Sequence, residues 1–169
     1  MTVLGQPSVE SGFMEGDLAS RYVATIGRLE RQGFTRFDVD GLVLLHRRDE
    51  SATGGKDTMV GVGYEPGTTS AALFEEQDKR VRGWYVDNVL AVRRRTGGVE
   101  LFSILFAESA DASAVEAARG PCPKRKGILS TRALVHGPNG DTEFFECNRM
   151  WGFAIIKRLR QDLLGFLGE

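Results

Sequence analysis

The closing segment of the chain, residues 128–167, constrains the fold more than any other stretch. Two apolar-rich runs flank the turn sequence Gly137-Pro138-Asn139-Gly140, and Asn-Gly supplies the positive φ that a tight hairpin turn needs. The residues after the hairpin predict an amphipathic helix with Lys157, Arg160 and Gln161 on its polar side. Its apolar arc consists of Ile155, Ile156, Leu159, Leu163, Phe166 and Leu167.

This helix needs a surface to pack on. Burying its apolar side chains would stabilise it by about 9–18 kcal/mol in total, at roughly 1.5–3 kcal/mol each. Ordering the backbone of about fifteen residues costs as much or more. The helix is therefore expected to lie on a sheet that includes the hairpin.

The N-terminal part predicts a second amphipathic helix. We expect residues 1–12 to form a flexible arm and residues 13–169 to form one domain. Five apolar residues recur at intervals of three or four, the spacing that places side chains on one face of a helix. Gly33 is placed to end this helix as a left-handed cap. These five residues are Met14, Leu18, Tyr22, Ile26 and Leu29.

The middle of the chain predicts several strands and two short helices. Strands are expected at Leu42–Leu45, Met59–Tyr64, Trp84–Val92 and Val99–Ala107. Pro66-Gly67 should end the second of these strands, which Gly61 and Gly63 weaken. The short helices are expected at Thr68–Arg80, largely exposed, and from a cap at Asp111 to Arg119.

These elements favour an α+β domain. Tight links between strands favour antiparallel pairing, so we expect a mostly antiparallel sheet of about six strands, with the N-terminal and C-terminal amphipathic helices packed on it. Val99–Ala107 is apolar on both faces, which indicates a central strand covered on both sides.

Composition excludes several classes of protein. The formal net charge of −1 does not suggest a nucleic-acid coat protein, and two cysteines in 169 residues are too few for a disulfide scaffold. The N-terminus lacks the basic and apolar regions of a signal peptide, and no apolar run approaches the ~18–20 residues of a membrane span. We expect a cytoplasmic protein without a membrane anchor.

The sequence offers few catalytic or metal-binding motifs. The glycines of residues 61–67 do not have the spacing of a dinucleotide-binding loop. Cys122, His136, Cys147 and His46 lack metal-ligand spacing. Cys147 and His136 could meet across the hairpin as a nucleophile and base, but a cysteine in an aromatic-rich strand is more often a small core residue. We therefore assign no catalytic residue, metal or cofactor.

The first functional hypothesis is a non-enzymatic interaction module. Such a module would present its antiparallel sheet or a groove to a protein partner or to a second copy of the chain. It rests on the lack of catalytic motifs and on a surplus of apolar strand residues at Leu101–Phe106 and Phe144-Phe145, which could leave an apolar patch.

Nucleic-acid binding is an alternative. Two basic clusters, interleaved with aromatic residues, could contact phosphates. They consist of Arg93, Arg94 and Arg95 in one case and of Lys124, Arg125 and Lys126 in the other. The balanced total charge favours the simpler interpretation, in which these side chains keep the surface soluble.

A second alternative is a small-molecule-binding domain or enzyme with a pocket between the sheet and the C-terminal helix. A helix packed on a sheet often leaves an apolar cavity with a few polar groups. Trp84, Tyr85, Arg132 and His136 are the candidate ligand-binding residues for such a pocket.

Overall fold

The computed structural model describes residues 17–50, 55–90, 98–123, 127–146 and 153–169. Its helices are α1 (Leu18–Arg31), α2 (Ala71–Tyr85), α3 (Ala112–Arg119) and α4 (Phe153–Leu167), and a π-helical turn, η1 (Val86–Leu90), follows α2. Its strands are β1 (Thr35–Val39), β2 (Leu42–Asp49), β3 (Lys56–Thr69), β4 (Val99–Ala110), β5 (Ile128–His136) and β6 (Asp141–Phe144). The predicted arm at residues 1–12 lies outside the described residues.

The described strands form one mixed sheet, in the order β1-β2-β3-β4-β5-β6. Neighbours pair antiparallel at β1–β2, β2–β3 and β5–β6, whereas β3–β4 and β4–β5 pair parallel. The α+β class and the number of strands are confirmed, but the prediction of a mostly antiparallel sheet is wrong. The long connections through α2 and α3 provide the crossovers that parallel pairing requires.

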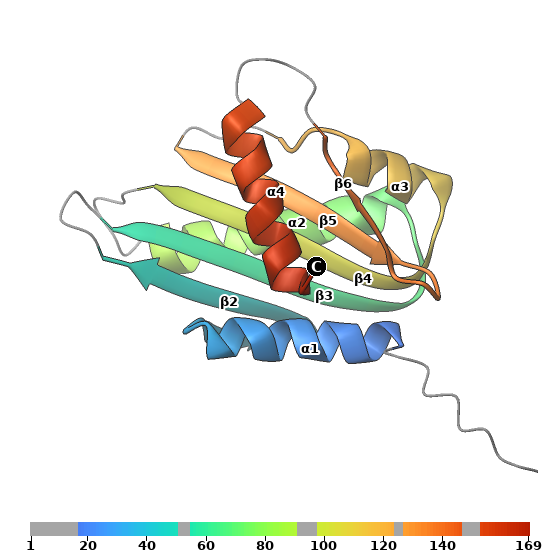
Figure 1. Ribbon diagram of the computed structural model, residues 1–169, viewed down its shortest axis with the longest axis horizontal. Coiled ribbons are helices and arrows are strands. Elements are labelled where there is room, and N and C mark those ends of the chain that lie inside the picture. Colours follow the sequence, from blue (N-terminus) through green and yellow to red (C-terminus); the bar gives the residue numbers. More distant parts are fainter. Residues whose placement is uncertain (1–16, 51–54, 91–97, 124–126, 147–152) are drawn as a thin grey trace, which may run out of the picture.

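Helices cover both faces of this sheet (Figure 1). Phe102, Ile104 and Phe106 of β4 pack in one cluster with apolar residues of α1 and α4. Leu101 and Leu105 face the other side, where α2 and α3 complete the core. Val99–Ala107 is buried throughout, so the prediction of a central strand covered on both sides is confirmed, and Leu101–Phe106 forms no exposed patch. The N-terminal and C-terminal helices, which were predicted to pack on the sheet, lie on one face, whereas α2 and α3, whose packing was not predicted, cover the other.

The strands before β4 differ from their predicted lengths. β1 was not predicted, and its residues are mostly exposed, so no apolar run marks it. The predicted strand at Leu42–Leu45 is present and continues to Asp49. β3 begins at Lys56 and continues through Pro66-Gly67 to Thr69, so the prediction that these two residues end the strand is wrong. A register shift between Glu65 and Thr68 accommodates them.

Helix α2 replaces two predicted elements. The short helix expected at Thr68–Arg80 continues through Tyr85, and η1 extends it to Leu90, so the strand predicted at Trp84–Val92 is wrong. The Ser70 hydroxyl caps the start of the helix by accepting a hydrogen bond from the backbone of Leu73. The buried residues of the helix, Phe74, Gln77, Asp78, Val81 and Tyr85, repeat with a helical period.

The remaining predicted elements are confirmed, with one local difference. The structure contains α1, with Gly33 at a φ of 84° after its end, α3 after a cap at Asp111, the β5–β6 hairpin and α4. Met14 lies outside the described residues. In the hairpin turn the positive φ angles fall on Gly137 (74°) and Gly140 (67°) and not on Asn139.

Candidate functional site

The edge of β5 is the first candidate site. β6 pairs only with the second half of β5, from Ala133 to His136. Among the described residues, no strand pairs with Ile128–Arg132 on the side away from β4. Within the part of the chain that the structure describes, this stretch of β5 is therefore an open edge, where backbone groups can bind an added strand.

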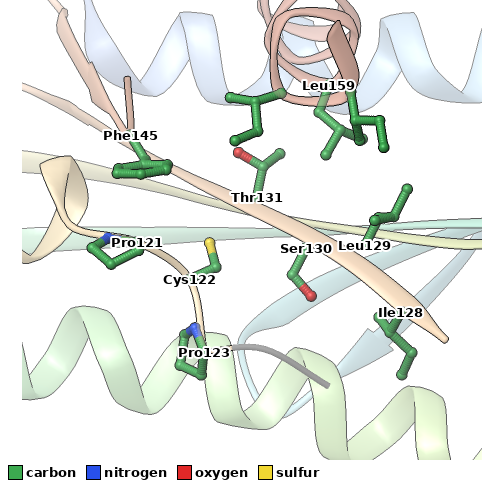
Figure 2. Close-up of a pocket in the computed structure, with 11 residues that line it drawn as sticks. Pro121, Cys122, Pro123, Ile128, Leu129, Ser130, Thr131, Phe145 and Leu159 are labelled. Carbon is green, nitrogen blue, oxygen red and sulfur yellow. The ribbon is translucent and has the colours of Figure 1, made fainter. Parts of the chain in front are cut away.

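An apolar groove of about 330 Å³ runs along this edge (Figure 2). Its floor is Ile128, Leu129, Ser130 and Thr131 of β5. Ile155, Ile156 and Leu159 of α4 line it together with Phe145, and the segment Pro121, Cys122 and Pro123 lines it as well. Figure 2 shows Phe145 and Leu159 on one side of β5 and Pro123 on the other, so the groove wraps around the strand edge.

Cys122 closes one end of the open edge. Burial raises the pKa of its thiol and keeps it protonated at neutral pH, against smaller opposing effects of the Arg132 guanidinium, of Arg82 and of the nearby backbone N–H of Arg132. Since alternate residues of a strand direct their backbone groups the same way, the N–H and C=O of Ser130 also face the open side. The Ser130 hydroxyl is buried and has no hydrogen-bond partner among the described residues.

The groove is apolar because most of the described residues that line it are aliphatic side chains, prolines or Phe145. Two of the large aliphatic side chains that line it are partly exposed, Leu129 at 39% and Ile155 at 45%. Pro121 and Pro123 lack backbone N–H groups and so cannot donate to the open edge. Among the described residues, no charged side chain lines the groove.

A second cavity lies on the other side of α4 and is polar. Its volume is about 290 Å³, and strands β2, β3 and β4 and the second half of α4 contribute to it. At its base the carboxylate of Glu100 is buried and pairs with Lys56 and Arg158. Asp162 of α4 and Thr58 of β3 also line this cavity.

Trp84 and Tyr85, two of the four predicted ligand-binding residues, lie at the end of α2. Trp84 is half-buried and packs its ring 5.0 Å from that of Phe37. Tyr85 is fully buried in the cluster between α2 and the sheet. These two residues belong to the face of the sheet opposite α4.

Arg132 and His136 lie on β5, four positions apart. The Arg132 guanidinium is buried, donates to the backbone O of Ala117 at 2.9 Å, and stacks over the Phe74 ring. His136 places its Nε2 3.5 Å from Oε1 of Glu143. None of the four predicted residues lines either cavity, although both cavities adjoin α4, where a pocket was expected.

Several other predicted features lie outside the described residues. These are Arg93–Arg95, Lys124–Lys126 and Cys147, the partner proposed for His136. Within the described part of the chain, no group of three or more His, Cys, Asp or Glu side chains is arranged to hold a metal ion. No described helix is long and apolar enough to cross a membrane.

No protein-family model matches the chain, and no curated protein sequence matches it.

Sequence reasoning missed the residues that line both cavities, although signals for some of them exist. The strand that follows Gly127, β5, is longer than the strand that follows Gly140, β6. A hairpin of these two strands therefore leaves part of β5 without a partner on that side. Between Val99 and Ala107, Glu100 is the one charged residue, and Ser103 is the one other polar residue. A charge in that position requires buried partners.

Proposed function

We propose that this protein is a non-enzymatic interaction module that binds an extended segment of a protein partner at the open edge of β5. The observation that supports this proposal is the unpaired stretch Ile128–Thr131 with an apolar groove along it. Addition of a strand to a sheet edge is an established mode of peptide recognition, in which backbone hydrogen bonds supply affinity and pockets for alternate side chains supply specificity.

The dimensions of the open edge define the segment that would bind. Four residues of strand span about 13 Å at roughly 3.3 Å per residue. Side chains of an added strand alternate between the two sides of the sheet. On one side they would meet Phe145 and Leu159, and on the other Pro123 and Ile128. Because the described residues that line the groove are uncharged, an apolar segment fits it best.

The expected energies are sufficient for specific but reversible binding. Each net backbone hydrogen bond contributes about 0.5–1.5 kcal/mol. Each apolar side chain buried in the groove contributes about 1.5–3 kcal/mol. The ordering of a flexible segment opposes these gains by about 2–5 kcal/mol, so micromolar rather than nanomolar affinity is expected.

Selection of short random peptides by display on the purified protein tests the proposal. Apolar peptides without charge in their central residues should be selected, and their binding should be measured by fluorescence polarisation. Leu129→Lys should weaken binding at least about tenfold, because it places a charge in the groove. Val23→Lys is the matched control, since Val23 is 64% exposed on α1 and lies outside the groove.

Hydrogen exchange locates the bound peptide. In the free protein the backbone amide of Ser130 should exchange quickly, whereas those of Leu129 and Thr131, which face β4, should be protected. A bound peptide should protect Ser130 without changing its two neighbours. Peptides that bind without protecting Ser130, or that bind Leu129→Lys with unchanged affinity, would contradict strand addition at this edge.

A second copy of the chain is the competing occupant. Light scattering after size-exclusion chromatography distinguishes self-association from binding of another protein. A protein that stays monomeric at all concentrations would support binding of a separate partner at this edge. A dimer that Leu129→Lys converts to a monomer would instead assign the edge to self-association and overturn the proposal of a separate partner.

A further inference from the structure

Strand β1 lies at the edge of the described sheet opposite β5 and β6. It pairs with β2, and among the described residues no strand pairs with it on its other side. The tight turn Asp40-Gly41, with φ angles of 47° and 78°, joins Val39 to Leu42, and residues that flank such a turn form a hydrogen-bonded pair. Hydrogen-bonded and non-hydrogen-bonded pairs alternate along antiparallel strands. The backbone N–H and C=O groups of Arg36 and Asp38 therefore face away from β2, where they can bind an added strand.

The side chains in the middle of β1 form a charged face and an aromatic face. On the charged face, Arg36 donates from Nη2 to Oδ1 of Asp38 at 2.8 Å, and both side chains are exposed. On the other face, the ring of Phe37 lies 5.0 Å from that of Trp84 of α2. Phe37 is still 38% exposed. The edge therefore presents an aromatic side chain between a positive and a negative charge.

We propose that this edge pairs with the same edge of a second copy of the chain, antiparallel and about a twofold axis at Phe37. In this register Arg36 of each copy lies opposite Asp38 of the other. These are the residues whose backbone groups face outward, so each opposite pair can exchange both of its backbone hydrogen bonds. Opposite charges directly across a strand pair also stabilise it. Phe37 meets its own copy at the axis, with Trp84 beside it.

The charges favour this register over its alternatives. A shift by two residues in one direction would place Arg36 opposite its own copy, and the same shift in the other direction would do so for Asp38. Like charges directly opposite each other destabilise a strand pair. A shift by one residue would set outward-facing backbone groups against groups that already bind β2. Parallel pairing in register would again place each charge beside its own copy.

A second copy fits this edge better than the other candidate occupants do. Charged side chains on an edge strand ordinarily prevent association, and charges of a single sign would repel a second copy. One charge of each sign, two residues apart, instead makes the edge complementary to itself. The open edge of β5 is a poorer match, because the described residues that line its groove are uncharged. Pairing about a twofold axis closes with two copies and leaves β5 free in both, so this inference does not depend on peptide binding there.

Sedimentation equilibrium of the full chain, from micromolar to millimolar concentration, tests the proposal with reversed charges. We expect the wild type to form a dimer. Arg36→Asp and Asp38→Arg each set like charges opposite each other, so each should weaken self-association at least about tenfold. In an equal mixture of the two variants every charge meets an opposite one. The mixture should therefore form a heterodimer about as stable as the wild-type dimer.

Two controls separate the edge of β1 from other surfaces. Asp49 accepts from Nε of Arg47 at 3.2 Å, in a pair with the same spacing on β2, and Asp49→Arg should leave the dimer unchanged. Leu129→Lys alters the groove at β5 and should also leave it unchanged. Thermal melting of each variant establishes that it is folded.

A disulfide tests the register independently. The Cα atoms of a non-hydrogen-bonded pair lie about 4.5 Å apart, within the range of about 4.4–6.8 Å that a disulfide spans. Phe37→Cys should therefore crosslink two copies under mild oxidation, whereas Val23→Cys, at a 64% exposed site on α1, should not do so beyond the wild-type level.

A dimer that each charge reversal weakens and the mixture restores would support pairing through β1. A wild type that stays monomeric up to millimolar concentration would overturn it, as would a mixture that associates no better than the single variants. A dimer that Leu129→Lys dissociates, or that Asp49→Arg weakens as much as Asp38→Arg does, would also overturn it.

Discussion

Gly61→Ala should destabilise the protein, because β3 and α2 approach too closely there for a methyl group. A Cβ built at Gly61 overlaps Cγ2 of Val81 and lies 3.0 Å from Cγ1 and 3.1 Å from Cβ of the same residue. Val81 is 1% exposed, so its side chain is enclosed by its neighbours. Overpacking of this kind costs about 1–3 kcal/mol. At this chain length each kcal/mol lowers the melting temperature by roughly 2–4 °C.

Val81→Ala should relieve the overlap that Gly61→Ala creates. Alone, Val81→Ala removes two methyl groups and should cost about 2–3 kcal/mol, from about 0.8 kcal/mol per group and the cavity left behind. If the two changes were independent, the double variant would lose about 3–6 kcal/mol. Because the new methyl fills the space that Val81 vacates, the double variant should instead be about as stable as Val81→Ala.

Urea denaturation of the four proteins of this double-mutant cycle measures the coupling. Gly83→Ala is the matched control, since no atom lies within 4 Å of a Cβ built there. This control lies in α2 and should be neutral or stabilising by up to about 1 kcal/mol, because alanine favours the helix. A Gly61→Ala variant as stable as the wild type, or additive losses in the double variant, would refute the close packing of β3 on α2.

Three further changes test other parts of the fold. The Arg119 guanidinium holds the pKa of Glu143 below its ordinary value. The pair therefore stabilises the folded protein at neutral pH, and this stabilisation is lost as the pH falls through the ordinary range of a carboxyl group and below. Arg119→Gln should therefore flatten the acid side of the stability curve, and an unchanged curve from pH 7 to about pH 3 in urea melts would contradict the pairing. Leu163→Ala, at a fully buried site of α4, should lower the free energy of unfolding by about 2–5 kcal/mol, measured by thermal melting. Ile155→Ala, at a site 45% exposed, should lower it by less than about 0.5 kcal/mol. Similar losses in the two variants would contradict the burial of α4. Asp111→Ala removes the oxygen that accepts from the Ala114 backbone at 2.9 Å and should cost about 0.5–2 kcal/mol in the same assay, whereas no loss would mean that the cap is dispensable.

The elements that sequence reasoning predicted correctly are those with local signals. The apolar period of α1, the cap at Asp111 and the turn between Gly137 and Gly140 each depend on residues close together in the chain. β1 lacked such a signal because its residues are largely exposed. The end of α2 was mistaken for a strand because Trp84 and Tyr85 favour strands in isolation, whereas burial of Tyr85 under the sheet holds it in a helix.

The candidate sites depend on contacts between segments that are far apart in the chain, and no local sequence pattern predicts such contacts. The groove at Leu129 exists because β6 ends before it covers all of β5 and because α4 passes beside the uncovered part. The polar cavity brings Glu100 of β4 together with Lys56 of β3 and Asp162 of α4, residues far apart in the chain. Their spacing in the sequence gives no reason to expect them in one place.

The sequence by itself determined which segments are apolar on one face, where most turns and helix ends fall, and that the closing hairpin and helix need a sheet. The tertiary structure alone decided which strands become neighbours, that β3, β4 and β5 pair parallel, and that Gly61 lies against α2. The physical reason is that backbone preferences and apolar periodicity act over a few residues, whereas the pairing of strands depends on which arrangement buries the most apolar surface across the whole chain.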